Sequence, residues 1–419
     1  MTTETLQKEW KETTLGEVAS NASRSFDFEG KEKVVFLNTG DVLNGKFLHK
    51  KWSKITSLLG QAKKAIEQGD ILFSEIRPAN GRYALVDFNS DDYVVSTKFM
   101  VIKSGEEIDN QYLYKILTYK KTLQQFQSIA ESRSGTFPQI TFDAVSHFPI
   151  HLPPFPEQKS IVAVLSSLDN KIELLRKQNE TLGQMARAIF HEWFVEFNFP
   201  NGKGQPYKKS SGKMIDSELG EIPKEWKMDK IGNYVDIRGG TTPSTKVPDF
   251  WNGNIAWTSP KDLSGLQEMF LFQTEKKITK EGLKQIGSGL LPKGTLLLSS
   301  RAPIGYIAIS NIEIAINQGY IAFLPNQLFS NYFMFLWLKT NMQTVLNVSN
   351  GSTFLEISKS SFKNIECLAP NLEILKEFDL IIGVIFEKVS RNLNQIEILS
   401  QSRDKLLPKL MNGEVRVKI

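Results

Sequence analysis

The sequence predicts an α+β fold in which one plan is built twice. It is a tandem duplication of two mixed, strand-rich domains joined by two long antiparallel coiled-coil helices, with pseudo-two-fold symmetry between the halves. Three observations predict this fold. Short motifs of residues 1–198 recur in residues 219–413, a proline marks the same boundary in each half, and each half ends in a long heptad pattern.

The recurring motifs keep their order and nearly their spacing. Gly-Asp-Ile-Leu-Phe-Ser leads to Arg77 in the first half, and Gly-Thr-Leu-Leu-Leu-Ser leads to Arg301 in the second. The motif Thr-Phe-x-x-Ile begins at Thr136 and again at Thr353. The separation falls only from 224 residues (Arg77 to Arg301) to 217 (Thr136 to Thr353), so few insertions distinguish the halves. Two similar but different domains suit the reading of two different half-sites.

Prolines and changes of composition divide the chain. Pro153 and its copy Pro370 lie at the ends of the strand-rich domains. The linker between the halves is basic and rich in Gly and Ser, which is typical of a solvated connector or of a segment that contacts phosphates. The expected divisions are a first strand-rich domain (1–152), a first long helix (153–198), the linker (199–218), a second strand-rich domain (219–370), a second long helix (371–413) and a tail (414–419).

Short β-branched and aromatic runs predict the strands of both domains. In the first domain the expected strands are Val34–Leu37, Ile71–Ser74, Tyr83–Val86, Val94–Val95 and Val101–Ile102, followed by a helix over Asn110–Ile129. In the second they are Thr295–Ser299, Tyr306–Ile309 and Tyr320–Leu324, followed by a helix over Ser330–Leu346.

Heptad patterns predict the long helices. Pro156 before Glu157 marks the start of the first, which we expect to reach about Val195 and to span roughly 58 Å. Gly413 ends the second, with Pro408 a point where it breaks or kinks. The alternating steps of four and three are the coiled-coil period, so the helices should pair, although each could instead pack separately on its own sheet. The apolar seams are Ile161, Leu165, Leu168, Ile172, Leu175, Asn179, Leu182, Ala186, Ile189 and Trp193, and Phe378, Ile382, Ile385, Val389, Asn392, Ile396, Leu399, Arg403, Leu406 and Leu410.

One amide interrupts each seam. Antiparallel alignment of the helix ends places Ile161 opposite Leu410, and in that register Asn179 falls opposite Asn392. A buried amide without a partner is costly, whereas two facing amides can satisfy each other and fix the register.

Composition narrows the class of protein. A chain of 419 residues with 41% hydrophobic and 23% charged residues is expected to be globular, and its net charge of +5 permits a polyanionic partner without requiring one. The single cysteine, Cys367, excludes an internal disulfide and is expected to be a buried structural thiol. No signal peptide or membrane-spanning run is recognisable, which predicts a cytoplasmic protein without membrane contact.

The motifs of an independent enzyme are missing. Leu152-Pro-Pro-Phe155 resembles a methyltransferase motif but has Leu152 where a hydrogen-bonding side chain is needed. Pro248-Asp249 with Glu275-Lys-Lys277 fits a nuclease pattern only loosely. His147 and His151 flank Pro149 and cannot form a helical zinc-ligand pair. We therefore expect no catalytic residues and no metal site.

An ordered set of motifs has a family resemblance. The motifs are Met185–Phe197, Leu219–Trp226, Gly239–Thr245, Phe250–Gly253, Trp257–Asp262 and Leu406–Glu414. Together with the duplication, they resemble the specificity (S) subunit of type I restriction–modification systems over essentially the whole chain. The resemblance implies two target-recognition domains, each reading one half of a bipartite, asymmetric site in double-stranded DNA, and a helix pair that sets the spacer.

The resemblance also implies partners. Two methyltransferase (M) subunits would dock on the helices and restriction/translocase (R) subunits would join them, with S-adenosylmethionine, ATP and Mg bound by those partners and no cofactor bound by this chain. The same recognition role could serve a methylation-only or phage-exclusion complex. A coiled-coil scaffold that does not bind DNA would explain the helices but not two divergent domains.

The DNA-binding candidates are chosen by side-chain type, because Arg and Lys hydrogen-bond to guanine and Asn and Gln to adenine. Arg77 and Arg301 come first, since each follows a strand and precedes a glycine by four residues, although each could simply brace its loop. Thr136 and Thr353 are expected to shape a turn. The further candidates are Arg82, Lys98 and Arg133 in the first domain, and Arg238, Thr241, Thr242, Lys246, Lys261, Asn317 and Gln318 in the second.

Overall fold

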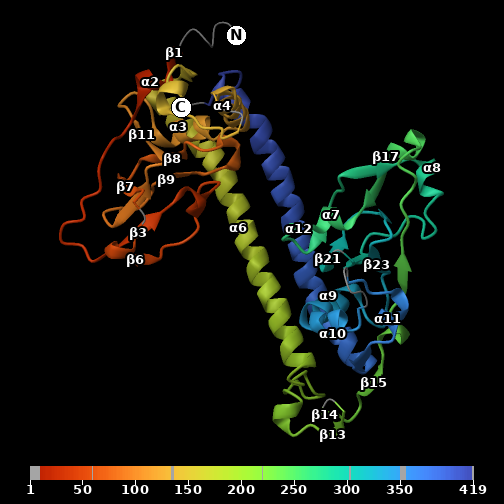
Figure 1. Cartoon of the computed structure of the whole chain (residues 1–419). Coiled ribbons are helices and arrows are strands. Elements are labelled where there is room, and N and C mark those ends of the chain that lie inside the picture. Colours follow the sequence, from red (N-terminus) through yellow and green to blue (C-terminus); the bar gives the residue numbers. More distant parts are fainter. Residues whose placement is uncertain are drawn as a thin grey trace. The chain divides into compact units, whose positions relative to one another are not determined.

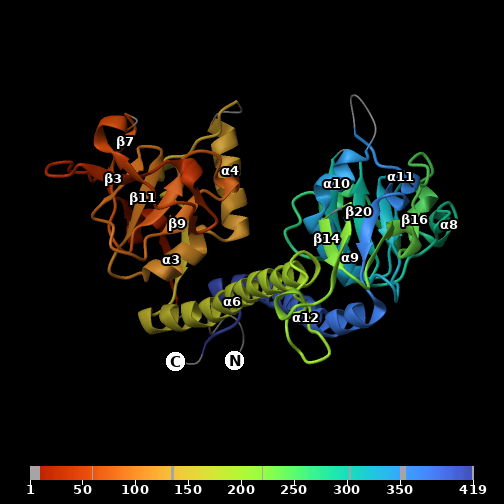
Figure 2. The same ribbon diagram turned by 90° about the horizontal axis from the view of Figure 1, so that it is seen from below.

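The computed structural model describes residues 10–58, 60–133, 136–218, 220–301, 303–349 and 355–417. The chain forms two compact units, one of residues 1–171 and 399–419 and the other of residues 172–398. The first unit contains the first head (residues 10–152) and the second unit contains the second head (residues 220–370). Each unit also contains segments of both long helices (Figures 1 and 2).

The first head has two four-stranded sheets. The main sheet has the order β2 (Ala19–Asn21), β11 (Phe99–Ser104), β8 (Ile71–Ser74), β9 (Tyr83–Leu85). The side sheet has the order β6 (Trp52–Lys54), β3 (Lys33–Leu37), β10 (Tyr93–Ser96), β7 (Ala62–Ala65). The main sheet packs against helices α3 (Asn110–Leu117) and α4 (Lys120–Arg133). Strand β8 is buried at all four residues, which explains the apolar run that precedes Ser74.

The second head repeats this plan. Its main sheet has the order β16 (Ile237–Gly239), β23 (Tyr320–Phe323), β20 (Leu296–Ser300), β21 (Ile304–Ser310), β18 (Phe270–Leu271). Its side sheet has the order β19 (Lys276–Ile278), β17 (Trp251–Thr258), β22 (Ala315–Ile316). Apart from the extra edge strands β7 and β18, the strand orders of the two heads correspond one to one. The predicted duplicated α+β fold is confirmed.

A strand pair ties each head to a long helix. In the first head β1 (Lys11–Thr14) pairs antiparallel with β12 (Pro149–Leu152), and in the second β15 (Lys227–Lys230) pairs with β24 (Glu366–Ala369). β12 and β24 are the last strands before the long helices, so the beginning and the end of each head meet at a helix start.

The helix expected after each main sheet is broken in two. The first prediction, Asn110–Ile129, is wrong in that α3 ends at Leu117 and α4 begins at Lys120. The second breaks between α9 (Asn331–Thr340) and α10 (Met342–Asn347), where Asn341 has non-helical backbone angles. Apolar periodicity continues across both breaks, so the pattern alone could not reveal them.

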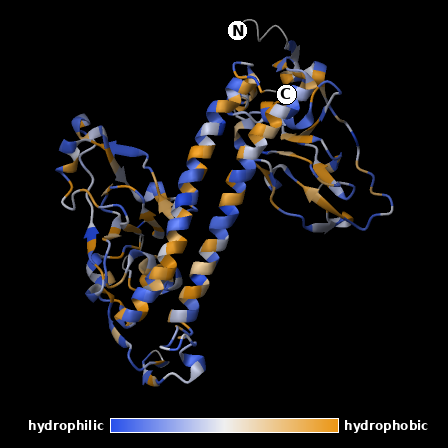
Figure 3. Cartoon of the chain, turned by 180° about the vertical axis from the view of Figure 1, so that it is seen from behind, coloured by the Kyte–Doolittle hydropathy of each residue, from blue (hydrophilic) through white to orange (hydrophobic). Residues whose placement is uncertain are grey.

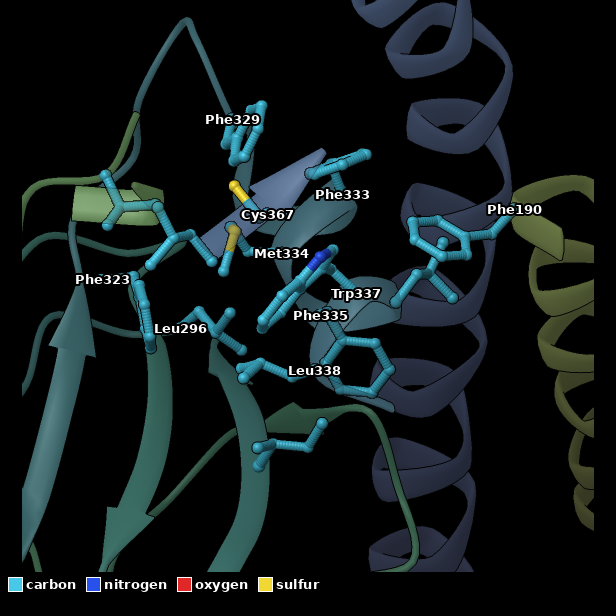
Figure 4. Packing of buried hydrophobic residues seen from close by; sticks show 14 of the residues in the cluster. Phe190, Leu296, Phe323, Phe329, Phe333, Met334, Phe335, Trp337, Leu338 and Cys367 are labelled. Carbon is cyan, nitrogen blue, oxygen red and sulfur yellow. The ribbon is translucent and has the colours of Figure 1, made fainter. Parts of the chain in front are cut away.

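The core of the second unit is centred on α9, which is buried around most of its circumference. Figure 4 shows Phe333, Met334 and Trp337 of this helix between the sheet and the long helices. Cys367 lies in the same cluster, and its burial raises the pKa of the thiol to about 12. The prediction of a buried structural cysteine is confirmed.

The long helices match in length. Helix α6 runs from Phe155 to Phe194 and α12 from Leu372 to Met411, 40 residues each. Pro408 lies inside α12, so it does not end the helix. Along both helices hydrophobic residues recur between hydrophilic ones (Figure 3), and the buried positions follow the expected 3.5-residue period.

The two helices pair antiparallel within each unit. In the second unit the rings of Trp193 and Phe378 lie 5.6 Å apart. In the first unit Leu410 shares a core cluster with Ile161 and Leu165. These contacts exclude separate packing of each helix on its own sheet.

An ion-pair network interrupts the apolar pairing in the first unit. Arg403 Nη1 donates to Asp169 Oδ1 at 2.9 Å, and Lys115 of the first head also donates to Asp169. Burial opposes the charged carboxylate, but the hydrogen bonds and charges of Lys115 and Arg403 hold the pKa of Asp169 below its ordinary value. This network accounts for the charged residue in an otherwise apolar seam.

The structure brings the two seam asparagines together in the second unit. Asn392 Nδ2 donates to Asn179 Oδ1 at 2.8 Å and to Gln178 Oε1 at 3.1 Å. The reciprocal bond is missing, because Asn179 Nδ2 and Asn392 Oδ1 have no partner among the residues that the structure describes. The pair is therefore only half satisfied, and the missing bond lowers its contribution to stability.

We expect single replacements in this pair to lower the free energy of unfolding and the double replacement not to lower it. Asn179→Leu leaves the fully buried Asn392 without its main partner and should lower the free energy of unfolding by about 1–3 kcal/mol. Asn392→Leu should cost less, because Asn179 is only partly buried. The double leucine variant should be at least as stable as wild type. Urea unfolding followed by circular dichroism measures all three, and a double variant less stable than either single one contradicts the expectation.

Candidate nucleic-acid interface

A polar groove opens on the second head. Its volume is about 590 Å³, and it lies where the end of β16, the loop before β23 and the segment before α11 (Lys359–Lys363) meet. We call it the head-2 groove. Its lining residues are Arg238, Gly239, Gly240, Thr241, Gly287, Ser288, Ser300, Gln318, Tyr320, Ile321, Glu356, Ile357, Ser358 and Lys359.

Glycine shapes one wall of the groove. A Cβ on Gly240 would clash with the carbonyl oxygen of Ile316, so only glycine lets this loop lie against the loop before β23. The backbone N–H of Thr241 donates to the same carbonyl at 3.1 Å. The neighbouring Gly239 is less constrained, because a Cβ there would meet only the end of the Lys359 side chain, with the amine 3.1 Å away.

The groove combines positive charge with amide and hydroxyl groups. Arg238 forms an ion pair with Asp236 and keeps 47% of its side chain exposed. Gln318, from the opposite loop, is held by Thr242, whose hydroxyl donates to Gln318 Oε1 at 2.6 Å. This bond fixes the orientation of an exposed amide, as recognition of a base edge requires. The structure thus unites Arg238, Thr241, Thr242 and Gln318, which the sequence analysis nominated separately.

The other candidates of the second head have different surroundings. Asn317 Oδ1 accepts the backbone N–H of Gly319 at 2.8 Å, so this side chain shapes the turn. Lys261 is exposed and forms an ion pair with Glu275 at 2.8 Å, and the hydrogen bond with Glu275 raises the pKa of Lys261. Lys246 is exposed in the loop before β17.

The predicted equivalence of Arg77 and Arg301 is wrong by one residue. The strand ladders align Leu72 with Leu297, since each pairs with the middle of the neighbouring strands on both sides. Arg301 therefore corresponds to Ile76, not to Arg77, and both Arg301 and Ile76 form an isolated bridge to the segment that follows. The first head has one more residue between the strand and the glycine that follows it. The sequence concealed this difference, because arginine and glycine are four residues apart in both heads.

Arg77 has an unusual backbone. Its φ of 44° lies in the left-handed region, where non-glycine residues are uncommon, and its side chain is exposed. The backbone N–H donates to the carbonyl of Pro138 at 3.1 Å, which holds this loop beside the Thr136 loop. The copy of that second loop, at Thr353 and Phe354, lies outside the described residues.

The remaining candidates of the first head divide by their contacts. Arg82 ties its loop to a distant segment, because Nη1 donates to the carbonyls of Gly40 and Val42 at 3.0 and 3.1 Å. Arg133 is exposed at the end of α4 and donates to the Thr141 hydroxyl at 3.5 Å. Lys98 is half-buried.

Two further kinds of site are absent from the described residues. Within them no group of three or more His, Cys, Asp or Glu residues is placed to hold a metal ion. No described helix is long and apolar enough to cross a membrane.

Comparison with known proteins places the chain in a family. The family described as "Type I restriction modification DNA specificity domain" matches residues 7–184 and again residues 223–406. The chain belongs to the type I restriction–modification specificity family. The double match coincides with the internal duplication.

Relatives and solved structures agree with this assignment. The type I restriction enzyme HindI specificity subunit of Haemophilus influenzae is 36% identical over 97% of this chain and 100% of its own length. The MjaIX specificity subunit of Methanocaldococcus jannaschii is 35% identical over 44% of each chain. The crystal structure of a type I restriction-modification S subunit from M. genitalium has a TM-score of 0.59 at 14% identity over 96% of each chain, a likeness that concerns the fold.

Lys359 of this specificity chain lies in the groove but was not predicted from the sequence. Its signal was nonetheless present, because Lys359 follows Ile357, the last residue of the repeated Thr-Phe-x-x-Ile motif, by two positions. The corresponding helix cap in the first head, Thr141, is followed by Phe142 instead. Comparing the halves position by position would have identified this lysine as a difference between the heads.

Two glycine replacements test the architecture of the head-2 groove. Gly240→Ala should destabilise the second head by about 1–3 kcal/mol, since the added methyl group meets backbone. Gly287→Ala is the matched control, because a Cβ there meets no atom within 4 Å and Gly287 lines the same groove. Thermal unfolding of both variants measures the difference, and equal melting temperatures would show that the groove wall adapts freely.

Proposed function

We propose that this chain is the DNA-sequence-recognition subunit of a type I restriction–modification complex. The observation that carries the proposal is that one chain of the specificity family holds two heads of the same fold with different recognition surfaces. A repeated fold supplies two binding modules, and different side chains on the same frame let each module read a different sequence. Each head would read one half of a bipartite, asymmetric site in double-stranded DNA.

The difference between the heads is chemical. Arg238 and Lys359 line the head-2 groove. The strand ladders place Ala22 of the first head at the position of Arg238. The helix caps place Phe142 at the position of Lys359. A guanidinium can bind guanine or phosphate, whereas alanine and phenylalanine offer only apolar contact. The two heads would therefore prefer different half-sites.

The helix pair would set the spacer between half-sites and dock two methyltransferase subunits. Its surface supports docking, since Leu380 and Val384 on α12 are 75% and 70% exposed and Ile381 lies beside them. Apolar side chains grouped in this way mark protein interfaces. Methyl transfer and cleavage, with S-adenosylmethionine, ATP and Mg, would belong to the M and R subunits. A complex that only methylates would use this chain in the same way.

The proposed function is tested by mapping methylated adenines in a genome with and without this chain. We expect a bipartite methylation pattern that disappears when the chain is deleted and returns when it is restored. The purified chain given S-adenosylmethionine should not methylate DNA until the M subunit is added. A pattern that persists without the chain would contradict the proposal.

Replacing Arg238 with Ala should change one half-site and leave the other intact. A lost bidentate contact to guanine weakens binding by roughly 1–3 kcal/mol and relaxes the sequence at that position. The measurement is the methylation pattern of the variant complex. Changes in both half-sites together would show that the two heads do not read separately.

Lengthening the helix pair should lengthen the spacer. Inserting four residues in each helix, next to Asn179 and next to Asn392, adds about one turn, roughly 6 Å, and introduces the same four-residue stutter into both seams. Because base pairs rise about 3.4 Å, the spacer should grow by one or two base pairs while both half-site sequences persist. An unchanged spacer would show that the helices do not set it.

A further inference from the structure

We infer that the lysine-bearing edge strands of the two side sheets, β6 in the first head and β19 in the second, bind the phosphates of the DNA backbone. The inference rests on the proposed function and assigns it a surface outside the head-2 groove and outside the loops of Arg77 and Arg301. None of the lysines on these two strands is among the DNA-binding candidates chosen from the sequence.

The two strands occupy the same place in the fold. Each lies at an edge of its side sheet and pairs antiparallel with the longer strand beside it, β6 with β3 and β19 with β17. That neighbour in turn pairs parallel with a third strand, β3 with β10 and β17 with β22. In the chain, this third strand comes just before an inner strand of the main sheet, β11 in the first head and β23 in the second. Figure 1 shows β6 beside β3 in the first head.

In the first head like charges face each other across the ladder. Lys33 of β3 and Lys54 of β6 are direct partners, so their side chains lie on the same face of the sheet. Both are exposed, and among the described residues neither has an ion-pair partner. Like charges placed directly opposite destabilise a sheet, and a bound polyanion would remove that repulsion.

The same edge carries more charge and an exposed aromatic ring. Lys50 and Lys51 lead into β6 and are exposed. Trp52 is 56% exposed and, two residues from Lys54 on one strand, shares its face. A large apolar ring on the same face as Lys33 and Lys54 is suited to contact the sugars of a DNA backbone while the amines meet its phosphates.

The second head has the same chemistry on a different sequence. Lys276 and Lys277 of β19 are exposed, and Lys276 Nζ lies 5.5 Å from the centre of the Trp251 ring. These residues line a cavity of about 530 Å³ together with Thr245, Asn252, Gly253 and Glu275. Glu275 is the acidic group there, and its carboxylate is paired with Lys261 rather than with the two strand lysines.

The recurrence points to a requirement that both heads share. Trp52-Ser-Lys54 and Lys276-Lys-Ile278 have no common motif, yet lysines beside a tryptophan appear at the same edge. Base contacts must differ between heads that read different half-sites, whereas phosphate contacts carry no sequence information and are needed by both. The edge strands have the character expected of such common contacts.

Salt dependence of DNA binding tests the inference in the assembled complex with M subunits. Lys33→Gln with Lys54→Gln removes two charges from the first head, and Lys276→Gln with Lys277→Gln removes two from the second. Each loss of two phosphate contacts should make the slope of log K against log salt less steep by about 1.8. Between 50 and 200 mM salt each variant should then lose about tenfold less affinity than wild type, with both half-site sequences unchanged.

A control in the first head distinguishes a local role from loss of charge. Lys120→Gln with Lys121→Gln removes two exposed charges at the start of α4, away from the side sheet, and should leave the slope at its wild-type value. Edge lysines also prevent sheets from associating edge to edge. Variants that aggregate but bind DNA with an unchanged slope would overturn the inference, as would an equal slope change in the control.

A second measurement needs no charge removal. Addition of the specific duplex should change the fluorescence of the wild-type complex more than that of Trp52→Phe, because the exposed ring becomes covered. No difference between the two would overturn the assignment in the first head. A wild-type complex that fails to bind duplex DNA in every assay would overturn the proposed function itself, a result distinct from unchanged binding by the edge variants.

Discussion

Antiparallel packing of α6 on α12 is the constraint on which the rest of the molecule depends. Apolar layers every 3.5 residues hold the two helices in one register, from Trp193 on Phe378 in the second unit to Leu410 with Ile161 in the first. Each head then begins and ends at a helix start, because its first strand pairs with its last. Local changes inside a head can therefore alter its surface without altering the helices that carry it.

Much of this arrangement could be predicted from sequence because it rests on periodicity. Steps of four and three identified both helices, and alignment of their ends was enough to set Asn179 against Asn392. The buried strands β8 and β20 were equally clear, since residues buried on both faces leave an uninterrupted apolar run. These features depend on which face of an element is covered, and sequence records that directly.

Features that depend on loops and edges could not be predicted in the same way. A single additional residue in a loop shifted Arg301 from the position of Arg77 to that of Ile76, and no periodicity spans a loop. Strands β6 and β19 carry lysines where an edge faces solvent, so they lack the apolar alternation that identifies a strand. The head-2 groove unites Arg238, Gln318 and Lys359 from segments far apart in the chain, which only the folded topology brings together.

The asparagine pair also distinguishes correct pairing from mispairing between molecules. The duplicated helices are offset by 217 residues, so two copies of α6 from different chains could align in the same layers. In that pairing Asn179 would face Leu175 of the other molecule, and in a pair of two α12 helices Asn392 would face Ile396. Either arrangement would bury two lone amides, whereas pairing within one chain buries a single bonded pair. One polar layer placed off the symmetry axis thus favours pairing of α6 with α12 over pairing of two like helices.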